Sequence, residues 1–273
     1  AASDVYKRQL KQEVVSYEAI DNGSSVTVKQ SVKVSGVQAE KVNGYGDTKT
    51  TITPVKEPLN DANTHFINNQ EWTIYADGTV VCQSVLLPRG NPLELLRLGY
   101  EFQFPANLGN VAYYGRGPEE NYADRKSGMP LGVYKTTAKA SFFPYGRPQD
   151  CGNHEDTRWV AVTDDKGQGL LFGSLGTPFA FSAIPYTTTE LILANHPVEL
   201  PKTTDRTVLV LSAATRGLGG ASCGPGPMSR DIIKANKPYP MSFFIRPVTA
   251  KSYKGELRVP AAELDMTMLT RTD

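Results

Sequence analysis

Residues 158–172, RWVAVTDDKGQGLLF, contain the pattern that decides the fold. An apolar run from Trp159 to Val162 is followed by the turn-forming DDKG and by a second apolar run from Gly169 to Phe172. Two short runs of this kind, separated by a glycine-containing turn, are typical of a β-hairpin. The segment therefore predicts two antiparallel strands.

The period of two residues recurs on both sides of this hairpin. Residues 25–34, SVTVKQSVKV, alternate polar and apolar side chains as a half-buried strand does. An Asp-Gly turn between 72–75 and 79–82 predicts a second hairpin. Pro and Gly interrupt the chain at intervals typical of a sandwich or barrel. Further strands are expected at 95–104, 131–143, 179–185, 207–214 and 240–247.

These patterns predict an all-β protein, a single large antiparallel β-sandwich over residues 10–250. Residues 36–70 are rich in Gly, Asn, Thr and Lys, and are expected to form an insertion or a long loop. Residues 1–9 resemble a translated adapter junction, so the chain is expected to be the back end of something longer. The polar residues 251–273 are expected to form a tail.

Composition and charge exclude several classes of protein. Lys plus Arg number 29 and Asp plus Glu 28, so the chain lacks the basic excess of a nucleic-acid binder. A hydrophobic content of 40% is too high for a disordered chain. No apolar stretch approaches the length of about 18 residues that a membrane-spanning helix needs. We therefore expect neither a nucleic acid nor a membrane as partner.

The cysteines and histidines do not indicate a metal site. Cys82, Cys151 and Cys223 are far apart and form no CxxC, which predicts reduced or buried thiols. The three histidines are also scattered, and none lies in a spacing typical of metal ligands.

Two segments concentrate polar side chains. The first, residues 113–125, is YYGRGPEENYADR, which suits either a sugar-binding platform or a corner of paired arginines and carboxylates. The second, residues 147–159, is RPQDCGNHEDTRW, which suits either general acid–base work or a polar loop. Because Glu155 and Asp156 are adjacent, a strand would place them on opposite faces, which argues against a catalytic pair.

A third segment, residues 215–227, is TRGLGGASCGPGP. Its GxGG run is not followed by a helical pattern, so a dinucleotide-binding loop is rejected. Cys223 would be a nucleophile only with a histidine in a recognised spacing, and none is present. A shaped loop at the end of a strand, of the kind that lines binding sites, fits the segment better.

Together the three segments resemble the last domain of the large bacterial β-galactosidases of glycoside hydrolase family two. The first is similar to the family motif W/Y-x-G-x-GP-x-ENY-x-DR, and the second to its P-x-E/D-x-G-N loop with the Arg-aromatic strand that follows. The third is similar to its G-[LI]-G-G motif, and a final FFIRP strand comes after it, at residues 243–247. The motifs occur in the family order and match residues 10–250.

The resemblance implies a supersandwich similar to the galactose mutarotase fold, at the C-terminal end of a retaining β-galactosidase that hydrolyses terminal β-D-galactosides. In that family both catalytic glutamates and the Mg²⁺ site lie on a preceding (β/α)₈ barrel. No residue here matches the glutamate motifs, so the resemblance implies no catalytic residue, metal ligand or cofactor in this chain, which alone should be inactive. The implied partners are a β-galactoside or another carbohydrate and the catalytic barrel of the same polypeptide.

The resemblance also implies a role for one loop, and the polar segments add further expectations. In the family, the loop after the GG motif reaches the mouth of the active site, and some members place a sugar-stacking Trp where Gly224 aligns. This implies a substrate-cleft loop of Gly219, Gly220, Ser222, Cys223 and Gly224. Carbohydrate-facing side chains are expected at Asn153, His154, Glu155, Arg158 and Trp159. A structural motif that ties the Pro118 turn to neighbouring strands is expected at Arg116, Glu120, Asn121, Asp124 and Arg125.

Other readings stay open at this point. An aldose 1-epimerase on a related sandwich would need an acid and a base across a sugar ring, such as His154 or His196 with Glu155 or Asp205. A stand-alone carbohydrate-binding module would need no catalytic partner. The sequence also leaves open a homo-oligomer and a cytoplasmic or periplasmic location.

Overall fold

The computed structural model describes residues 8–40, 53–54, 64–90, 94–202, 204–220, 224–234 and 236–249. This part of the chain is nearly all β, and every paired strand in it runs antiparallel to its partner. The prediction of an all-β, antiparallel β-sandwich is therefore confirmed. No described helix is long and apolar enough to cross a membrane.

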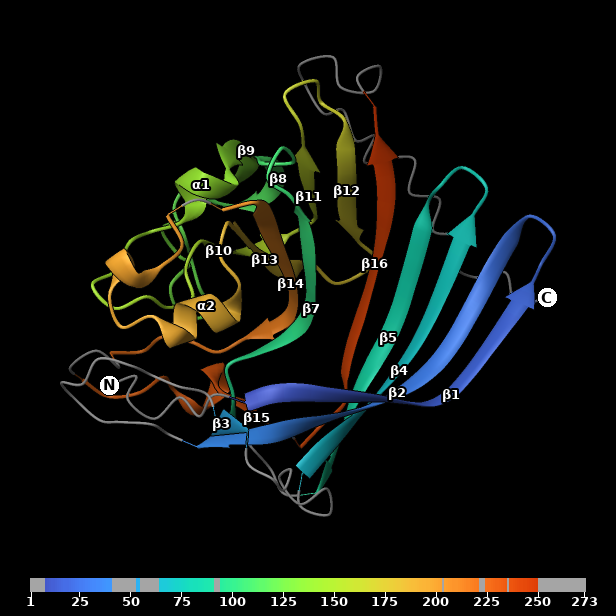
Figure 1. Cartoon of the computed structure of the whole chain (residues 1–273), viewed down its shortest axis with the longest axis horizontal. Coiled ribbons are helices and arrows are strands. Elements are labelled where there is room, and N and C mark those ends of the chain that lie inside the picture. The colour runs from blue at the N-terminus through green and yellow to red at the C-terminus, as the bar shows by residue number, and fades with distance from the viewer. Residues whose placement is uncertain are drawn as a thin grey trace.

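A 10-stranded sheet forms the larger layer, with strands in the order β1-β2-β4-β5-β16-β12-β11-β8-β9 and β3 paired to β2. Figure 1 shows this sheet fanning out from the body of the molecule toward β1. Its strands are β1 (Arg8–Asp21), β2 (Ser25–Glu40), β3 (Thr53–Pro54), β4 (Thr64–Tyr75), β5 (Val80–Gly90), β8 (Asn110–Arg116), β9 (Leu131–Thr137), β11 (Trp159–Thr163), β12 (Gly169–Ser174) and β16 (Tyr239–Val248).

A 4-stranded sheet forms the second layer, in the order β10-β13-β14-β7. Its strands are β10 (Asn153–Thr157), β13 (Phe179–Ile184), β14 (Arg206–Thr215) and β7 (Arg97–Pro105). A separate pair joins β6 (Glu94–Leu95) to β15 (Ile233–Lys234). The short helical segments are α1 (Ala138–Ser141), α2 (Thr188–Leu193), η1 (Pro197–Glu199) and η2 (Ser229–Asp231).

The core lies between the two sheets and follows the period of two. Val160 and Val162 on β11 are fully buried, and they share one cluster with Leu209 and Leu211 of β14. Successive strand residues point to opposite faces, so residues two apart enter the same layer. Among the described residues, this cluster takes none from β1 or β2. The larger sheet therefore extends beyond the smaller one that covers it (Figure 1).

The predicted hairpins are confirmed. Strands β11 and β12 pair from Trp159↔Gly173 to Thr163↔Gly169. Strands β4 and β5 are joined by the turn after Tyr75, where Asp77 accepts a hydrogen bond from the backbone N–H of Thr79 at 2.8 Å. Gly78 has φ 82°, a left-handed conformation that glycine adopts without steric cost.

Three predicted boundaries need correction. The expected loop at 36–70 is partly strand, because β2 continues to Glu40 and β4 already begins at Thr64. The rest of it lies outside the described residues, apart from the two residues of β3, as do residues 1–7 and 251–273. The strand expected at 131–143 ends at Thr137, whose side chain caps α1 by accepting from Ala140 N. Strand β1 had no counterpart in the sequence-based prediction.

Candidate functional site

The turn between β8 and β9, residues 117–130, brings the three sequence segments together. Its residues bond to the segment around β10 on one side and to the loop after β14 on the other. The start of the first segment is strand rather than turn, because β8 runs on to Arg116. We call this turn the bracing turn.

Asn121 is the fully buried centre of the bracing turn. Its Nδ2 donates to the carbonyls of Arg116 at 3.1 Å and Glu119 at 3.0 Å, and its Oδ1 accepts from Glu155 N at 2.8 Å. The backbone of Asn121 also exchanges hydrogen bonds with Asn153, at 2.7 and 2.8 Å. One amide side chain thus joins the turn to β10, with donor and acceptor both used.

Glu120 ties the same turn to the segment before β10. Its carboxylate accepts from Arg125 at 3.1 Å, from the backbone N–H of Gly152 at 2.8 Å and from the hydroxyl of Tyr145. The side chain is 17% exposed, so these donors replace most of its water. A largely buried carboxylate is tolerated only with such partners.

Asp124 connects the bracing turn to the loop after β14. One carboxylate oxygen accepts from Leu218 N at 2.9 Å and the other from Gly219 N at 2.7 Å. Gly217 lies so close that a Cβ there would come within 2.6 Å of Asp124 Oδ2 and 2.8 Å of Asp231 Cβ. Only glycine fits at that position. The loop after β14 therefore packs closely against the bracing turn in addition to forming hydrogen bonds with it. We call this pair of hydrogen bonds the Asp124 clamp.

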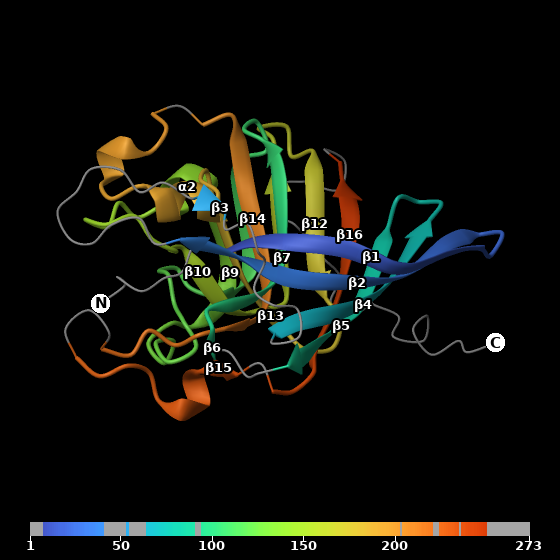
Figure 2. The same ribbon diagram turned by 60° about the horizontal axis from the view of Figure 1, so that its bottom comes forward.

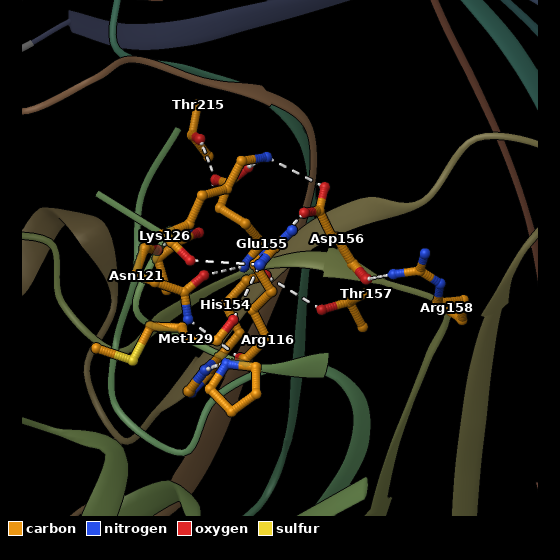
Figure 3. Close-up of polar contacts among 12 residues, drawn as sticks. Arg116, Asn121, Lys126, Met129, His154, Glu155, Asp156, Thr157, Arg158 and Thr215 are labelled. Atoms are coloured by element: carbon orange, nitrogen blue, oxygen red, sulfur yellow. Dashed lines mark hydrogen bonds and ion pairs between the residues drawn. The ribbon is translucent and has the colours of Figure 1, made fainter. Parts of the chain in front are cut away.

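Glu155 and Asp156 lie around one lysine (Figure 3). Lys126 Nζ is 3.1 Å from Asp156 Oδ1 and 4.0 Å from Glu155 Oε2. The register of β10 shifts between His154 and Thr157, and Asp156 has φ 52°. This β-bulge corrects the expectation that adjacent residues would point to opposite faces, since a bulge redirects side chains locally.

Both of these carboxylates are engaged. Asp156 also accepts from Arg116 Nε, and Glu155 Oε1 accepts from Thr215 Oγ1 and, at 3.0 Å, from Asn153 Nδ2. Although burial acts to raise the pKa of Asp156, hydrogen bonds from Arg116 and Lys126 hold it below its ordinary value. Asp156 is therefore ionised at neutral pH and suits bracing better than proton donation.

His154 lies inside the protein and does not reach a surface ligand. Its side chain packs against Phe181, with ring centroids 5.1 Å apart, and its Nδ1 lies 3.0 Å from Arg116 O and 3.1 Å from Tyr113 Oη. Burial lowers the pKa of His154 to about 4, so the imidazole is neutral at neutral pH.

Of the five residues expected to face a carbohydrate, three are buried, so the expectation is corrected for Asn153, His154 and Trp159 and stays a prediction for Glu155 and Arg158. Asn153, His154 and Trp159 are 1%, 4% and 8% exposed, and Trp159 belongs to a second apolar cluster on the other face of the large sheet. Arg158 is half-buried, with its guanidinium 5.6 Å from the centroid of the Tyr114 ring. The sequence showed polar residues before a strand, but not that residues 153–157 themselves form a strand of the smaller sheet.

The described parts of the predicted substrate-cleft loop form a tight turn. Gly219 has φ 56°, and a Cβ there would come within 2.5 Å of Pro227 N. Gly220 N donates to Pro225 O at 2.9 Å, and Gly224 N donates to Gly220 O at 2.6 Å. Ser222 and Cys223 lie outside the described residues. The role of this loop in a substrate cleft stays a prediction.

The sequence analysis missed Lys126, Tyr145 and Thr215 as members of the site. Lys126 directly follows the ENYADR motif, which is the one signal that pointed to it. Tyr145 and Thr215 come from segments 25 and 60 residues away from the carboxylates they bond, so no local pattern links them.

The groups considered for acid–base and metal chemistry are not assembled. His196 bonds Glu199 at 2.9 Å and Asp205 bonds Arg206 at 2.8 Å, while His154 is buried. In the described part of the chain, no three His, Cys, Asp or Glu side chains are placed to hold a metal ion. Cys82 and Cys151 are free and fully buried, and burial raises the pKa of each thiol to about 12. Cys223 lies outside the described residues.

Several curated proteins are similar to part of this chain. The β-galactosidase of Priestia megaterium is 35% identical over 178 residues, which is 65% of this chain and 17% of that protein. The β-galactosidase BgaC of Bifidobacterium adolescentis is 43% identical over 143 residues, 51% of this chain and 13% of that protein. The β-galactosidase small subunit of Latilactobacillus sakei is 38% identical over 159 residues, 55% of this chain and 49% of that subunit.

The chain thus spans less than a fifth of the first two relatives and about half of the small subunit. A solved structure of a putative aldose 1-epimerase from Escherichia coli covers 85% of this chain and 68% of its own, at 11% identity and a TM-score of 0.36. The sequence profile of the family described as "Beta galactosidase small chain" matches residues 4–245. This chain belongs to the β-galactosidase small-chain family.

Proposed function

We propose that this chain is the C-terminal domain of a retaining β-galactosidase, and that it works with a catalytic component carrying both catalytic glutamates. The observation that carries the proposal is the convergence of three family motifs on the bracing turn, in a chain that belongs to the small-chain family. The proposed substrate class is terminal β-D-galactosides, and the name β-galactosidase of the relatives supports it.

The role of this domain in the reaction is to shape the cleft. Retaining hydrolysis needs two carboxylates about 5–5.5 Å apart, one as nucleophile and one as proton donor. Asp156 is paired with Arg116 and Lys126, and its lowered pKa makes it a poor proton donor. These charges instead stabilise β10 and the bracing turn, which hold the loop at Gly219, Gly220 and Gly224 beside the sugar. The Mg²⁺ that the family uses would belong to the catalytic component.

Hydrolysis of a chromogenic β-galactoside tests this proposal. The isolated 273-residue chain should release no nitrophenol above the buffer blank, with intact P. megaterium β-galactosidase as the positive control. A chimera of that enzyme, in which residues 8–249 of this chain replace its corresponding domain, should hydrolyse the substrate. Turnover by the clean isolated chain, or a folded chimera without activity, would contradict the proposal.

A further inference from the structure

A groove of about 560 Å³ lies on the large sheet, across strands β1, β2, β4, β5 and β16. Trp72 and Phe243 pack into the core between the sheets. Their neighbours Glu71 and Ser242, which line the groove, therefore point away from the smaller sheet. Figure 2 shows β1 and β2 running at a large angle to β16, so the sheet twists strongly in this region, and such twist curves its faces. We call this hollow the sheet groove.

A row of polar side chains crosses the sheet groove from strand to strand. Its five members lie directly opposite one another on neighbouring strands, and they are Glu18, Lys29, Glu71, Gln83 and Ser242. Lys29 Nζ lies 3.6 Å from Glu71 Oε2, so the middle of the row is an ion pair. Because neighbouring strands lie about 4.8 Å apart, the row is about 19 Å long and suits an elongated ligand.

Three members of this row keep their hydrogen-bonding groups available for a ligand. Within the described part of the chain, the side chains of Glu18, Gln83 and Ser242 make no hydrogen bond or ion pair. Glu18 and Gln83 are exposed and Ser242 is half-buried, so a molecule in the groove reaches all three. The amide and the hydroxyl each donate and accept, whereas the carboxylate only accepts. A hydroxyl group, which also donates and accepts, is complementary to each of them.

Charge and apolar content narrow the class of ligand. The charged side chains that line the groove are Glu18, Glu71 and Lys29, and two carboxylates against one ammonium disfavour a phosphate or another anion. In the described part of the chain, no cluster of His, Cys, Asp or Glu is placed to hold a metal ion. Val85 and Pro240, which lie opposite each other beside the polar row, offer one small apolar contact. A neutral ligand with many hydroxyl groups and short apolar faces fits this combination.

We propose that the sheet groove binds a neutral oligosaccharide. Its hydroxyl groups bond Glu18, Gln83 and Ser242, and the C–H face of one sugar ring packs on Val85 and Pro240. The volume of the groove lies within the range of about 300–1,000 Å³ that small-molecule sites occupy. This inference does not depend on the proposed function, because it needs neither a catalytic component nor hydrolysis.

The experiment titrates the 273-residue chain with β-1,4-linked galactotetraose and follows the backbone amides by NMR. The amides of Glu71, Gln83 and Ser242 should shift and saturate with a Kd of about 1 mM, while those of β13 in the smaller sheet stay in place. Inorganic phosphate is titrated in parallel and should shift none of the groove amides. No saturable shift at the groove with the sugar would overturn the proposal, and saturation by phosphate would overturn the neutral ligand class.

The double variant Gln83→Ala/Ser242→Ala removes two of the groups that should bond the sugar, and its Kd should rise about tenfold. Gln103→Ala is the matched control, because Gln103 is an exposed glutamine on β7 whose Nε2 donates to Glu101. The control should bind the sugar as the parent chain does. Both variants should melt within about 2 °C of the parent chain, since neither change removes a core side chain.

A folded double variant that binds the sugar as tightly as the parent chain would show that the polar row is not the site. None of these outcomes bears on hydrolysis by the chimera described above, so the proposed function is tested separately.

Discussion

The two ends of the large sheet share one hydrogen-bonded ladder but differ in their surroundings. All five residues of β11 are buried, with Val160 and Val162 in the core between the sheets and Trp159 and Ala161 in the apolar cluster on the other face. On β1, Val14, Val15 and Tyr17 are 58%, 60% and 64% exposed, although β1 pairs with β2 along most of its length. Figure 1 shows the turn from β1 into β2 far from the second layer. Backbone pairing extends a sheet, but only a second layer buries its side chains.

The largest difference in stability is expected between a substitution under the smaller sheet, on β12, and one on the exposed strand β1. Phe172 is fully buried, with its ring centroid 5.1 Å from that of Phe102. Phe172→Ala should lower the free energy of unfolding by about 3–5 kcal/mol, because a large core cavity is left. Tyr17→Ala should change it by less than about 0.5 kcal/mol, as exposed substitutions do. Urea denaturation of both variants checks this, and equal losses would show that β1 is as buried as β12.

The pH dependence of stability should also distinguish the covered part of the molecule from β1, because the covered part contains an uncharged histidine. The pKa of His154 is about 4 in the folded state and about 6.5 in the unfolded chain. As pH falls from 6.5 to 4, His154 binds a proton in the unfolded chain but remains largely neutral in the folded protein. The free energy of unfolding therefore falls. The expected loss from this group is about 3 kcal/mol between pH 7 and pH 4.

His154→Phe should remove that part of the pH dependence. The comparison is the change in urea midpoint between pH 7 and pH 4.5 for the parent and the variant. Asp156, whose pKa is lowered, destabilises both proteins in the same direction at lower pH, so the difference between them isolates His154. Parallel pH profiles would show that His154 is accessible to protons in the folded state.

A smaller effect is expected at the bracing turn, which lies against the covered end. Asn121→Ala leaves buried backbone groups of Arg116, Glu119 and Glu155 without their partner. The expected cost is about 1–3 kcal/mol, seen as a melting temperature lower by a few degrees. Asn107→Ala, in an exposed turn, is the control and should melt with the parent. An unchanged melting temperature for Asn121→Ala would show that this side chain does not stabilise the fold.

Removing the Asp124 clamp should have the smallest effect on overall stability, and its effect should be confined to the loop after β14. Asp124 is exposed, so Asp124→Ala should cost less than about 1 kcal/mol overall. Hydrogen exchange at the amides of Leu218 and Gly219 should nevertheless become faster, because both lose their acceptor. Asp205→Ala, which removes an exposed partner of Arg206, should leave those two amides unchanged. Equal exchange in both variants would show that the loop holds its shape without the clamp.

Local pattern predicted much of the two sheets but not every strand. The hairpin at Trp159–Thr163 and Gly169–Ser174 was predicted because its turn residues lie between the strands that they join. Strand β1 was missed, and it lies at the edge of the sheet with most of its residues exposed. The strand β10 was not predicted, since NHEDT has no apolar alternation.

The same division applies to the candidate site. Sequence analysis expected Arg116, Glu120, Asn121, Asp124 and Arg125 to form a structural motif, and the hydrogen bonds of these residues agree with that role, which stays a proposal. Among the expected sugar-facing residues, Asn153, His154 and Trp159 are buried instead, because burial depends on which layer covers a strand. The residues next to a strand in the sequence do not show which layer will cover it.

The sequence by itself determined that the chain is all β, where its main hairpins turn, and which family it resembles. These properties follow from side-chain alternation and from backbone preferences of Gly, Pro and Asp, which act between residues close in the chain. Only the tertiary structure decided that Asp124 meets Leu218, 94 residues away, and that Lys126 lies between Glu155 and Asp156. Such contacts form when two sheets pack and a bulge redirects one strand, so their partners are chosen by the whole fold.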